Sequence, residues 1–431
     1  MIVSLIIVFL HTAAPIDAFQ LPKIKFVGIS ENVHNIPKRS IESGDGEALR
    51  ANLEKHCGLT QSSTVLTNES YLRWEPDLHK SYEVANVIFQ EIVDVSNLIF
   101  ICTKDTSHDT NRPHSKRIIS CPSMSRPQDL QAIAKVLQSD RCKLLLGLES
   151  VSAELYPDSP SPYLQLTFSD LQYHEGRQPD EALLQLQPSE TVATSNTENW
   201  VDNFLGKYNI CPYTSSVKKA AVGLSSVQVP VGNIHIVVGS TNLPDTSKIR
   251  QIDYDILRSA TLVSTFWSET QTLLQSSETE WATSLVVFPE YDDDFDFFIE
   301  VCDNIVQPMI EATSSTDFIG RAWFHPKYDA DQVGHTSVIA GHAVPHKLVQ
   351  EFVQTINGLE SAKSITMGAL GEANNKVRMT PHATINILRR SQLNAAAQYE
   401  KGLGSKRPKP NSIYVRNTLK LIELLKGTNV L

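Results

Sequence analysis

The sequence feature that most constrains the fold is a series of apolar segments in the second half, which alternate between strand and helix character. Residues 227–238, 284–288 and 317–324 have the composition and length of buried strands. Between them, apolar residues recur at helical spacing over 256–274 and 295–306, and Pro308 is expected to end or kink the second helix. This β-α-β-α-β order predicts an α/β or α+β fold in which helices pack on a small sheet.

A second alternation of the same kind runs from residue 76 to residue 170, and we interpret it as a small α/β domain of its own. Apolar residues at helical spacing from Tyr82 to Ile92 predict one helix, and residues 127–138 predict another that Pro127 opens. Four apolar stretches are the strand candidates: 97–102, 117–121, 142–148 and 163–168.

The chain of 431 residues is long enough for more than one core, and we expect two domains, each a small sheet with packed helices. Residues 171–196 are polar and aperiodic, which predicts a linker. The second domain, 197–431, is expected to open at a capping box, Ser195 to Glu198, with an amphipathic helix that Pro212 stops. Later segments predict an excursion over about 332–375 with a helix near 347–356, and two closing helices, 383–397 and 412–425.

Composition limits the classes of partner. The net charge of −10 argues against binding to nucleic acid or to an anionic membrane surface, because both require clustered lysine and arginine. The six cysteines contain no CxxC pair, so neither a disulfide framework nor a zinc ribbon is predicted. A small-molecule ligand is the partner class left open, and composition predicts neither a cofactor nor an oligomeric state.

The N-terminus predicts targeting. An apolar run from Ile2 to Leu10 is followed by small residues up to Ala18, as in a signal peptide spanning 1–18. The next residue is Phe19, and this arrangement resembles the bipartite presequence of algae with secondary red plastids, in which a transit peptide begins with phenylalanine. Residues 19–75 are then a transit peptide and a loosely ordered lead. Plastid import is the predicted location; the alternative is secretion or the endomembrane lumen. After cleavage no stable membrane span is expected, since the apolar run is too short.

Several motifs of the second half follow one another in a fixed order. They are Trp200-Val201, Phe204-Leu205, Ile210-Cys211-Pro212-Tyr213, Ile236-Val237-Val238, Ser284 to Pro289, Asp294 to Phe298, Phe324 to Tyr328, Thr380 to Arg389 and Ile413 to Asn417. Together they resemble the bacterial family called domain of unknown function 1415, over about 197–425. The first half resembles no family in this way.

The chain departs from the family pattern at two histidines. Phe288 stands where the family has histidine before the proline of a strand end, and Asn386 stands where a later histidine is expected. A metal site built on the family's histidines would therefore lose two candidate ligands, and we predict no metal site.

Cys211 and His325 are the candidate catalytic residues. Both are placed at element ends beside proline, where α/β folds carry functional groups. A thiolate is a good nucleophile when a neighbouring histidine lowers the thiol pKa. The structural alternative is that Cys211 is a small buried hydrophobe and His325 a hydrogen-bonded cap.

Four residues of the closing segments are the candidate ligand-binding groups: Arg389, Tyr414, Arg416 and Asn417. Arg389 and Arg416, both expected on the closing helices, have the chemistry to clamp a carboxylate or phosphate, with structural ion pairs as the alternative. The acidic run from Glu290 to Asp296 is interpreted as helix capping, with Asp294 as N-cap, rather than as a cation site.

Two functions follow from these residues. The first is an enzyme whose Cys/His-containing pocket performs acyl-transfer or hydrolytic chemistry on a small anionic substrate. The second is a non-catalytic binding or assembly module of the plastid. The Walker, Rossmann, Gly-x-Ser-x-Gly and His-Glu-x-x-His motifs are missing from the sequence, which argues against the common nucleotide-binding, hydrolase and zinc-protease classes.

Overall fold

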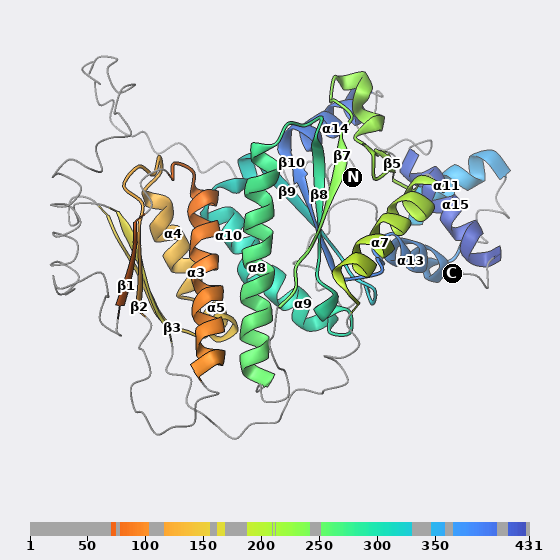
Figure 1. Ribbon diagram of the computed structural model, residues 1–431. Coiled ribbons are helices and arrows are strands. Elements are labelled where there is room, and N and C mark those ends of the chain that lie inside the picture. Colours follow the sequence, from red (N-terminus) through yellow and green to blue (C-terminus); the bar gives the residue numbers. More distant parts are fainter. Residues whose placement is uncertain are drawn as a thin grey trace, which may run out of the picture.

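The computed structural model describes residues 70–74, 78–102, 116–155, 162–168, 188–208, 210–211, 213–241, 251–329, 346–357, 365–402 and 413–427. Two four-stranded sheets lie on either side of a layer of helices (Figure 1). The expected mixture of helices and small sheets is confirmed. In the described part of the chain, no helix combines the length and the apolar character that a membrane span requires.

The first sheet has the order β1-β2-β4-β3. Its strands are β1 (Ser70–Trp74), β2 (Lys116–Ser120), β3 (Leu148–Glu154) and β4 (Tyr163–Phe168). β1 and β2 are parallel, whereas β4 is antiparallel to both β2 and β3. The helices of this half are α3 (Ser81–Cys102), α4 (Gln128–Leu137) and α5 (Asp140–Leu146).

The second sheet repeats this arrangement, with the order β7-β8-β10-β9. Its strands are β7 (Asn233–Val238), β8 (Trp281–Val287), β9 (Ile319–Phe324) and β10 (Thr384–Arg389). β7 and β8 are parallel, and β10 is antiparallel to β8 and β9. The carboxyl ends of β7, β8 and β9 therefore meet the amino end of β10 at one edge, which we call the strand-end edge.

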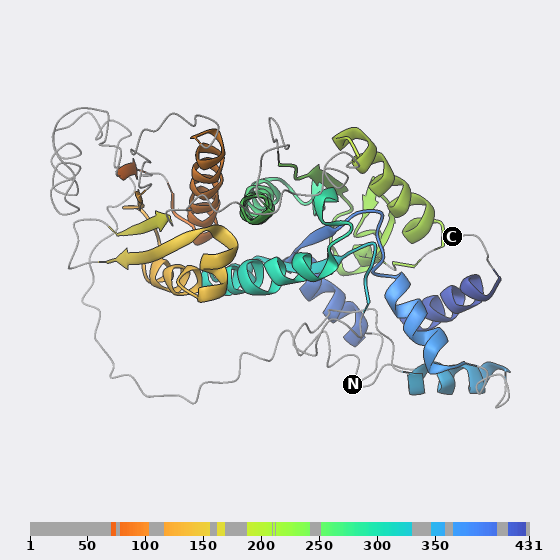
Figure 2. The same ribbon diagram turned by 90° about the horizontal axis from the view of Figure 1, so that it is seen from below.

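Helices cover both faces of the second sheet (Figures 1 and 2). On the inner face lie α8 (Gln251–Gln275) and a continuous helical segment made of α9 (Phe295–Val301), the π-helical η5 (Cys302–Val306) and α10 (Gln307–Ala312). The outer face packs against α7 (Glu190–Trp200), the π-helical η1 (Val201–Gly206) and α14 (Arg390–Gly402). A separate apolar cluster joins α11 (His346–Asn357), α13 (Met367–Lys376) and α15 (Ile413–Gly427).

Five short elements complete the described chain. They are β5 (Thr214–Ser216), β6 (Lys219–Ala220) and the 3-10 helices η2 (Val222–Val227), η4 (Pro289–Tyr291) and η6 (Ser315–Asp317).

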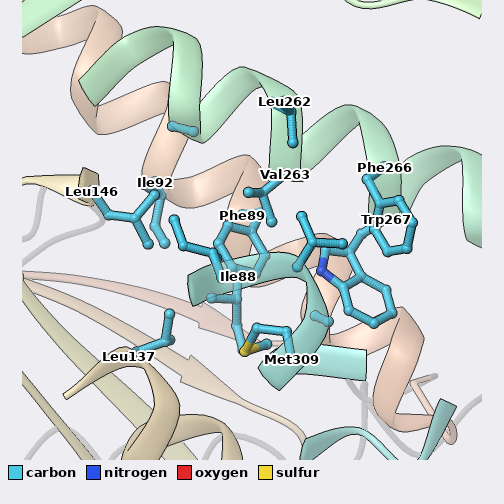
Figure 3. Packing of buried hydrophobic residues seen from close by; sticks show 14 of the residues in the cluster. Ile88, Phe89, Ile92, Leu137, Leu146, Leu262, Val263, Phe266, Trp267 and Met309 are labelled. Atoms are coloured by element: carbon cyan, nitrogen blue, oxygen red, sulfur yellow. The ribbon is translucent and has the colours of Figure 1, made fainter. Parts of the chain in front are cut away.

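The main apolar core is continuous between the two halves. Buried side chains of α3, among them Ile88 and Phe89, pack in the same cluster as Phe266 and Trp267 of α8 (Figure 3). These four side chains are fully buried. Apolar burial is the main stabilising contribution in folding, so the contact between α3 and α8 stabilises the packing of the two halves against each other.

The register of the two sheets is equivalent. Ser120, at the end of β2, pairs with Tyr163, the first residue of β4; Val287, at the end of β8, pairs with Thr384, the first residue of β10. The following residue also makes the same bonds in both halves: Cys121 N donates to Pro162 O, and Phe288 N donates to Ala383 O. A proline comes next in each case, Pro122 or Pro289.

Many predicted elements are confirmed, including β4 (Tyr163–Phe168) at its predicted bounds, α4, α8 and α11. Pro308 does not end its helix: the helical segment continues through it, and the π-helical turn η5 lies directly before it, where the backbone hydrogen-bond pattern is already irregular.

Two strand predictions in the first half are wrong. Residues 97–102 form the end of α3, and residues 142–146 belong to α5. Short apolar runs do not distinguish a buried helix from a strand. For α5 the deciding features are local: Ser139 caps the helix by accepting a hydrogen bond from Cys142 N, and Gly147 ends it in the left-handed region at φ 63.

Two predictions in the second half also need correction. Residues 384–389 form strand β10, so the expected helix over 383–397 begins only at Arg390. The expected capping box at Ser195 is wrong, because α7 begins at Glu190 and its N-cap is Ser189; the end of the predicted linker is therefore helical. β1, in turn, lies within the segment that we expected to be a loosely ordered lead. The predicted signal peptide, most of the predicted 19–75 lead, and residues 332–345 and 358–364 of the predicted excursion lie outside the described residues.

A core substitution tests whether the two halves form one folding unit. Phe266→Ala removes a fully buried ring from the shared core, and we expect the free energy of unfolding to fall by about 3–5 kcal/mol. Urea denaturation followed by circular dichroism measures the change, and we expect one transition. The control is Leu144→Ala, whose side chain is 53% exposed and which should change stability by less than about 0.5 kcal/mol. A loss confined to one of two separate transitions would contradict a shared core.

Candidate functional site

The strand-end edge holds a carboxylate–imidazole pair. Asp292 follows β8, His382 precedes β10, and their Oδ2 and Nδ1 atoms are 2.6 Å apart. The other carboxylate oxygen of Asp292 accepts a hydrogen bond from Ala383 N at 2.8 Å. Both oxygens of Asp292 are therefore held. Because a carboxylate faces Nδ1, that ring nitrogen carries the proton and the imidazole has a fixed orientation.

Local sequence features position both members of this pair. Pro289, two residues after the end of β8, is the first residue of η4, and Asp292 follows η4 just before α9. On the other side, the hydroxyls of Thr380 and Thr384 both donate to the backbone carbonyl of His382, at 2.6 and 2.7 Å. His382 is only 6% exposed, so its ring is held in place by the main chain and by packing.

The second ring nitrogen of His382 meets α7. Asn196 Nδ2 lies 3.2 Å from His382 Nε2. With the proton on Nδ1, the Nε2 atom is an acceptor, and the Asn196 amide donates to it. Asn196 itself is exposed, so the basic nitrogen is capped by a side chain at the molecular surface.

His325 lies at the end of β9 and is fully buried. Its Nε2 atom is 2.8 Å from the carbonyl oxygen of Tyr291, and its Nδ1 accepts a hydrogen bond from Lys327 N. The rings of Phe295 and Phe298 lie against it. Burial is the main cause that lowers the pKa of His325, so the ring is neutral and fixes the turn after β9.

Cys211 is partly exposed and lies between η1 and β5. Burial of the sulfur raises the pKa of the Cys211 thiol, although hydrogen bonds with Tyr213 and Thr214 partly oppose the rise. Both ring nitrogens of His325 bond to the main chain rather than to this sulfur. Neither arrangement favours a thiolate–imidazole pair, so the Cys211–His325 site stays a sequence prediction.

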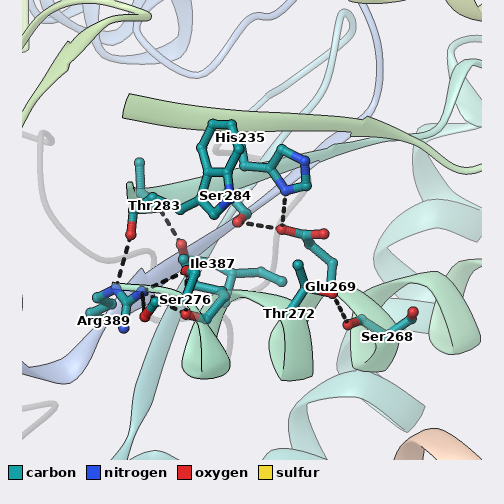
Figure 4. Close-up of polar contacts among 11 residues, drawn as sticks. His235, Ser268, Glu269, Thr272, Ser276, Thr283, Ser284, Ile387 and Arg389 are labelled. Carbon is teal, nitrogen blue, oxygen red and sulfur yellow. Dashed lines mark hydrogen bonds and ion pairs between the residues drawn. The ribbon is translucent and has the colours of Figure 1, made fainter. Parts of the chain in front are cut away.

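Arg389 is the last residue of β10 rather than part of a closing helix (Figure 4). Its guanidinium donates to the carbonyl oxygens of Trp281, Leu273 and Ser276, and to the hydroxyl of Ser276. It therefore satisfies carbonyl groups at the carboxyl end of α8. Burial lowers its pKa. The other three predicted ligand-binding residues, Tyr414, Arg416 and Asn417, belong to α15, but their side chains lie outside the described part.

The acidic run has several separate roles. Asp294 is the N-cap of α9 and accepts from Phe297 N, which confirms the capping interpretation for this residue. Asp293 pairs with Lys327, and Glu290 accepts two hydrogen bonds from Thr241. Among the residues that the structure describes, no group of three or more His, Cys, Asp and Glu residues is arranged to hold a metal ion.

A second polar group lies under the same sheet and was not expected from the sequence. Glu269 of α8, only 4% exposed, accepts hydrogen bonds from Ser284 Oγ and from His235 Nδ1 (Figure 4). The first half has a counterpart, because Glu91 of α3 pairs with Arg117 of β2. A buried glutamate that binds the second strand is thus common to both halves, which indicates a structural role.

The Asp292–His382 pair, in contrast, belongs to the second half alone. By the register of the sheets, Ser125 is the first-half equivalent of Asp292, and Ser161, outside the described residues, precedes β4 as His382 precedes β10. The sequence analysis mentions Asp292 only as part of the acidic run Glu290 to Asp296, and His382 only as part of the segment Thr380 to Arg389 that resembles the family. Nothing in the spacing of these two residues along the chain predicts that they are in contact.

A family model described as "Protein of unknown function (DUF1415)" matches residues 240–338. The resemblance inferred from the sequence is thereby confirmed for this segment, which includes Asp292 and His325; the N-terminal half is not matched. No curated protein and no solved structure matches the chain.

The neutral state of His325 predicts a pH dependence of stability. Its pKa is lowered in the folded state, so below the ordinary histidine value of about 6.5 the unfolded chain binds a proton more readily. The free energy of unfolding therefore falls as pH drops below about 6.5. Urea titrations across this range should show a shallower fall for His325→Gln than for the unchanged protein. Equal slopes in the two proteins would contradict the assignment.

Proposed function

We propose that this protein is an enzyme in which His382 acts as a general base, oriented by Asp292, in a hydrolytic or acyl-transfer reaction at the strand-end edge. The observation that carries the proposal is the 2.6 Å contact between Asp292 Oδ2 and His382 Nδ1. A carboxylate in this position fixes the tautomer and stabilises the imidazolium that forms when Nε2 takes a proton.

Two further features support the proposal. The pair lies where the ends of several strands meet, which is where α/β folds place their reactive groups. It is also confined to one of two halves that share strand order and register. Features needed for the fold are expected in both halves, whereas a reactive pair needs to occur only once.

The proposed base acts on a substrate that takes the position of the Asn196 amide. In the present arrangement Nε2 accepts from Asn196, so an incoming water or hydroxyl must replace that donor before its proton can be transferred. Asn196 lies on the exposed side of α7, so moving it leaves the apolar core intact. Plastid import remains part of the proposal and rests on the N-terminal sequence alone.

Substitution of the pair tests the reaction. Hydrolysis of a panel of 4-nitrophenyl esters is the assay, and His382→Gln should lower the rate by about 10²–10⁴-fold, as expected for loss of a general base. Asp292→Asn should also lower it, because an amide N–H facing Nδ1 moves the ring proton to Nε2. The matched control is Asp293→Asn, an exposed neighbouring carboxylate that pairs with Lys327 and should retain the rate. Equal rates in folded His382→Gln and unchanged protein would reject the proposal in favour of a non-catalytic binding module.

Removal of the cap on Nε2 tests the position of the substrate. In Asn196→Ala the lone pair of His382 Nε2 is open to solvent, so carbethoxylation of His382 by diethyl pyrocarbonate should become several-fold faster. Mass spectrometry of peptides gives the rate for each histidine, and the exposed His79 serves as internal reference. An unchanged rate at His382 would show that Asn196 does not control access to this nitrogen.

A further inference from the structure

We infer that the protein is a fused pseudo-dimer: residues 70–168 and the core of the second half are two copies of one β-α-β-α-β-β unit, joined through an isologous helical face. The apolar surface of α8 therefore packs against a second copy of the same unit, and the first half of the chain is that copy. The shared strand order and register are the first evidence.

The central helices of the two units bury equivalent positions. With Glu91 of α3 aligned to Glu269 of α8, five apolar positions coincide and all are buried to within 1%: Val84 with Leu262, Ala85 with Val263, Ile88 with Phe266, Phe89 with Trp267, and Val95 with Leu273. The two glutamates are themselves 5% and 4% exposed. The apolar positions follow the periodicity of any amphipathic helix, but a buried glutamate at the same place in both helices does not follow from that periodicity.

The polar partners of the two glutamates are also equivalent. Glu91 contacts Arg117 at 3.6 Å, and Glu269 accepts from Ser284 at 2.6 Å. Arg117 pairs with Leu166 of β4, and Ser284 pairs with Ile387 of β10. Both partners are thus three residues before the end of the second strand of their sheet. The side chains differ, but the position bound by the buried carboxylate is the same.

Contacts between the units are reciprocal. Tyr82, in the first turn of α3, has its ring against Phe318, which directly precedes β9. In the opposite direction, the Ile256 side chain near the start of α8 lies beside Gly147, which directly precedes β3. With Glu91 aligned to Glu269, Ile256 is equivalent to Leu78, one helical turn before Tyr82, so the two contacts involve neighbouring rather than identical positions. Each unit thus uses the start of its central helix to contact the residue before the third strand of the other unit, as a two-fold relation requires.

The differences between the units show a division of roles. In the first unit residues 155–162 connect β3 to β4, whereas in the second residues 325–383 connect β9 to β10 and include α11 and α13. Leu155, packed against the core, follows β3 where His325 follows β9. The second unit carries the added helices and the polar side chains of the strand-end edge, and the first contributes the covering surface.

The two-fold relation predicts a neighbour pair that can be tested by cross-linking. Asn86 donates to Gln271 at 2.7 Å across the α3–α8 contact. The symmetry mate of this pair is Val93 with Ser264. The test uses the full chain with a protease site inserted in the segment 171–187, and with cysteines at Asn86 and Gln271 or at Val93 and Ser264. Each protein is treated with a short bismaleimide, cleaved and run on a denaturing gel.

Both cysteine pairs should hold the two fragments in one band, while each single-cysteine variant, which contains the same native cysteines, should give two bands. Linkage of Asn86→Cys with Gln271→Cys but not of Val93→Cys with Ser264→Cys would overturn the two-fold relation. Failure of both pairs would show that α3 and α8 do not pack as described. The result does not depend on activity, so it stands or falls separately from the proposed role of His382.

Discussion

The packing of α3 against α8 is the interaction on which the rest of the structure depends. Each sheet has helices on its inner face, and these helices meet in one apolar cluster that includes Phe89 and Trp267. Neither sheet would bury the same area alone, and apolar area removed from water is the largest favourable contribution to folding. The first half therefore has a clear physical role even without a reactive group.

This shared scaffold makes the differences between the halves informative. Both retain a proline after the second strand and a buried glutamate on the central helix. Among the residues that the structure describes, the second half alone places a carboxylate against an imidazole at the ends of its strands. Burying such groups is costly unless their hydrogen bonds are satisfied, and the bonds to Ala383 N and Asn196 meet that requirement. The pair is consequently both stable and oriented.

Much of the fold could be predicted from periodicity and capping, and the errors have physical causes. The bounds of β4 and the N-cap role of Asp294 depend on short-range patterns, and both predictions are confirmed. Residues 97–102 were misassigned because a short apolar run occurs at the end of a helix as well as in a strand. The segment of β10 was predicted to be part of a helix because the pairing with β8 and β9 that makes it a strand comes from distant parts of the chain and leaves no local pattern.

By itself, the sequence determined that strands and helices alternate in both halves, that Asp294 caps a helix, and that residues 240–338 resemble a family of unknown function. Only the tertiary structure decided which side chains meet. Asp292 and His382 are 90 residues apart and come together because β8 and β10 are antiparallel neighbours. His325, in contrast, bonds to the main chain of Tyr291 and Lys327. Such meetings depend on strand order and register, which long-range packing sets and local sequence does not encode.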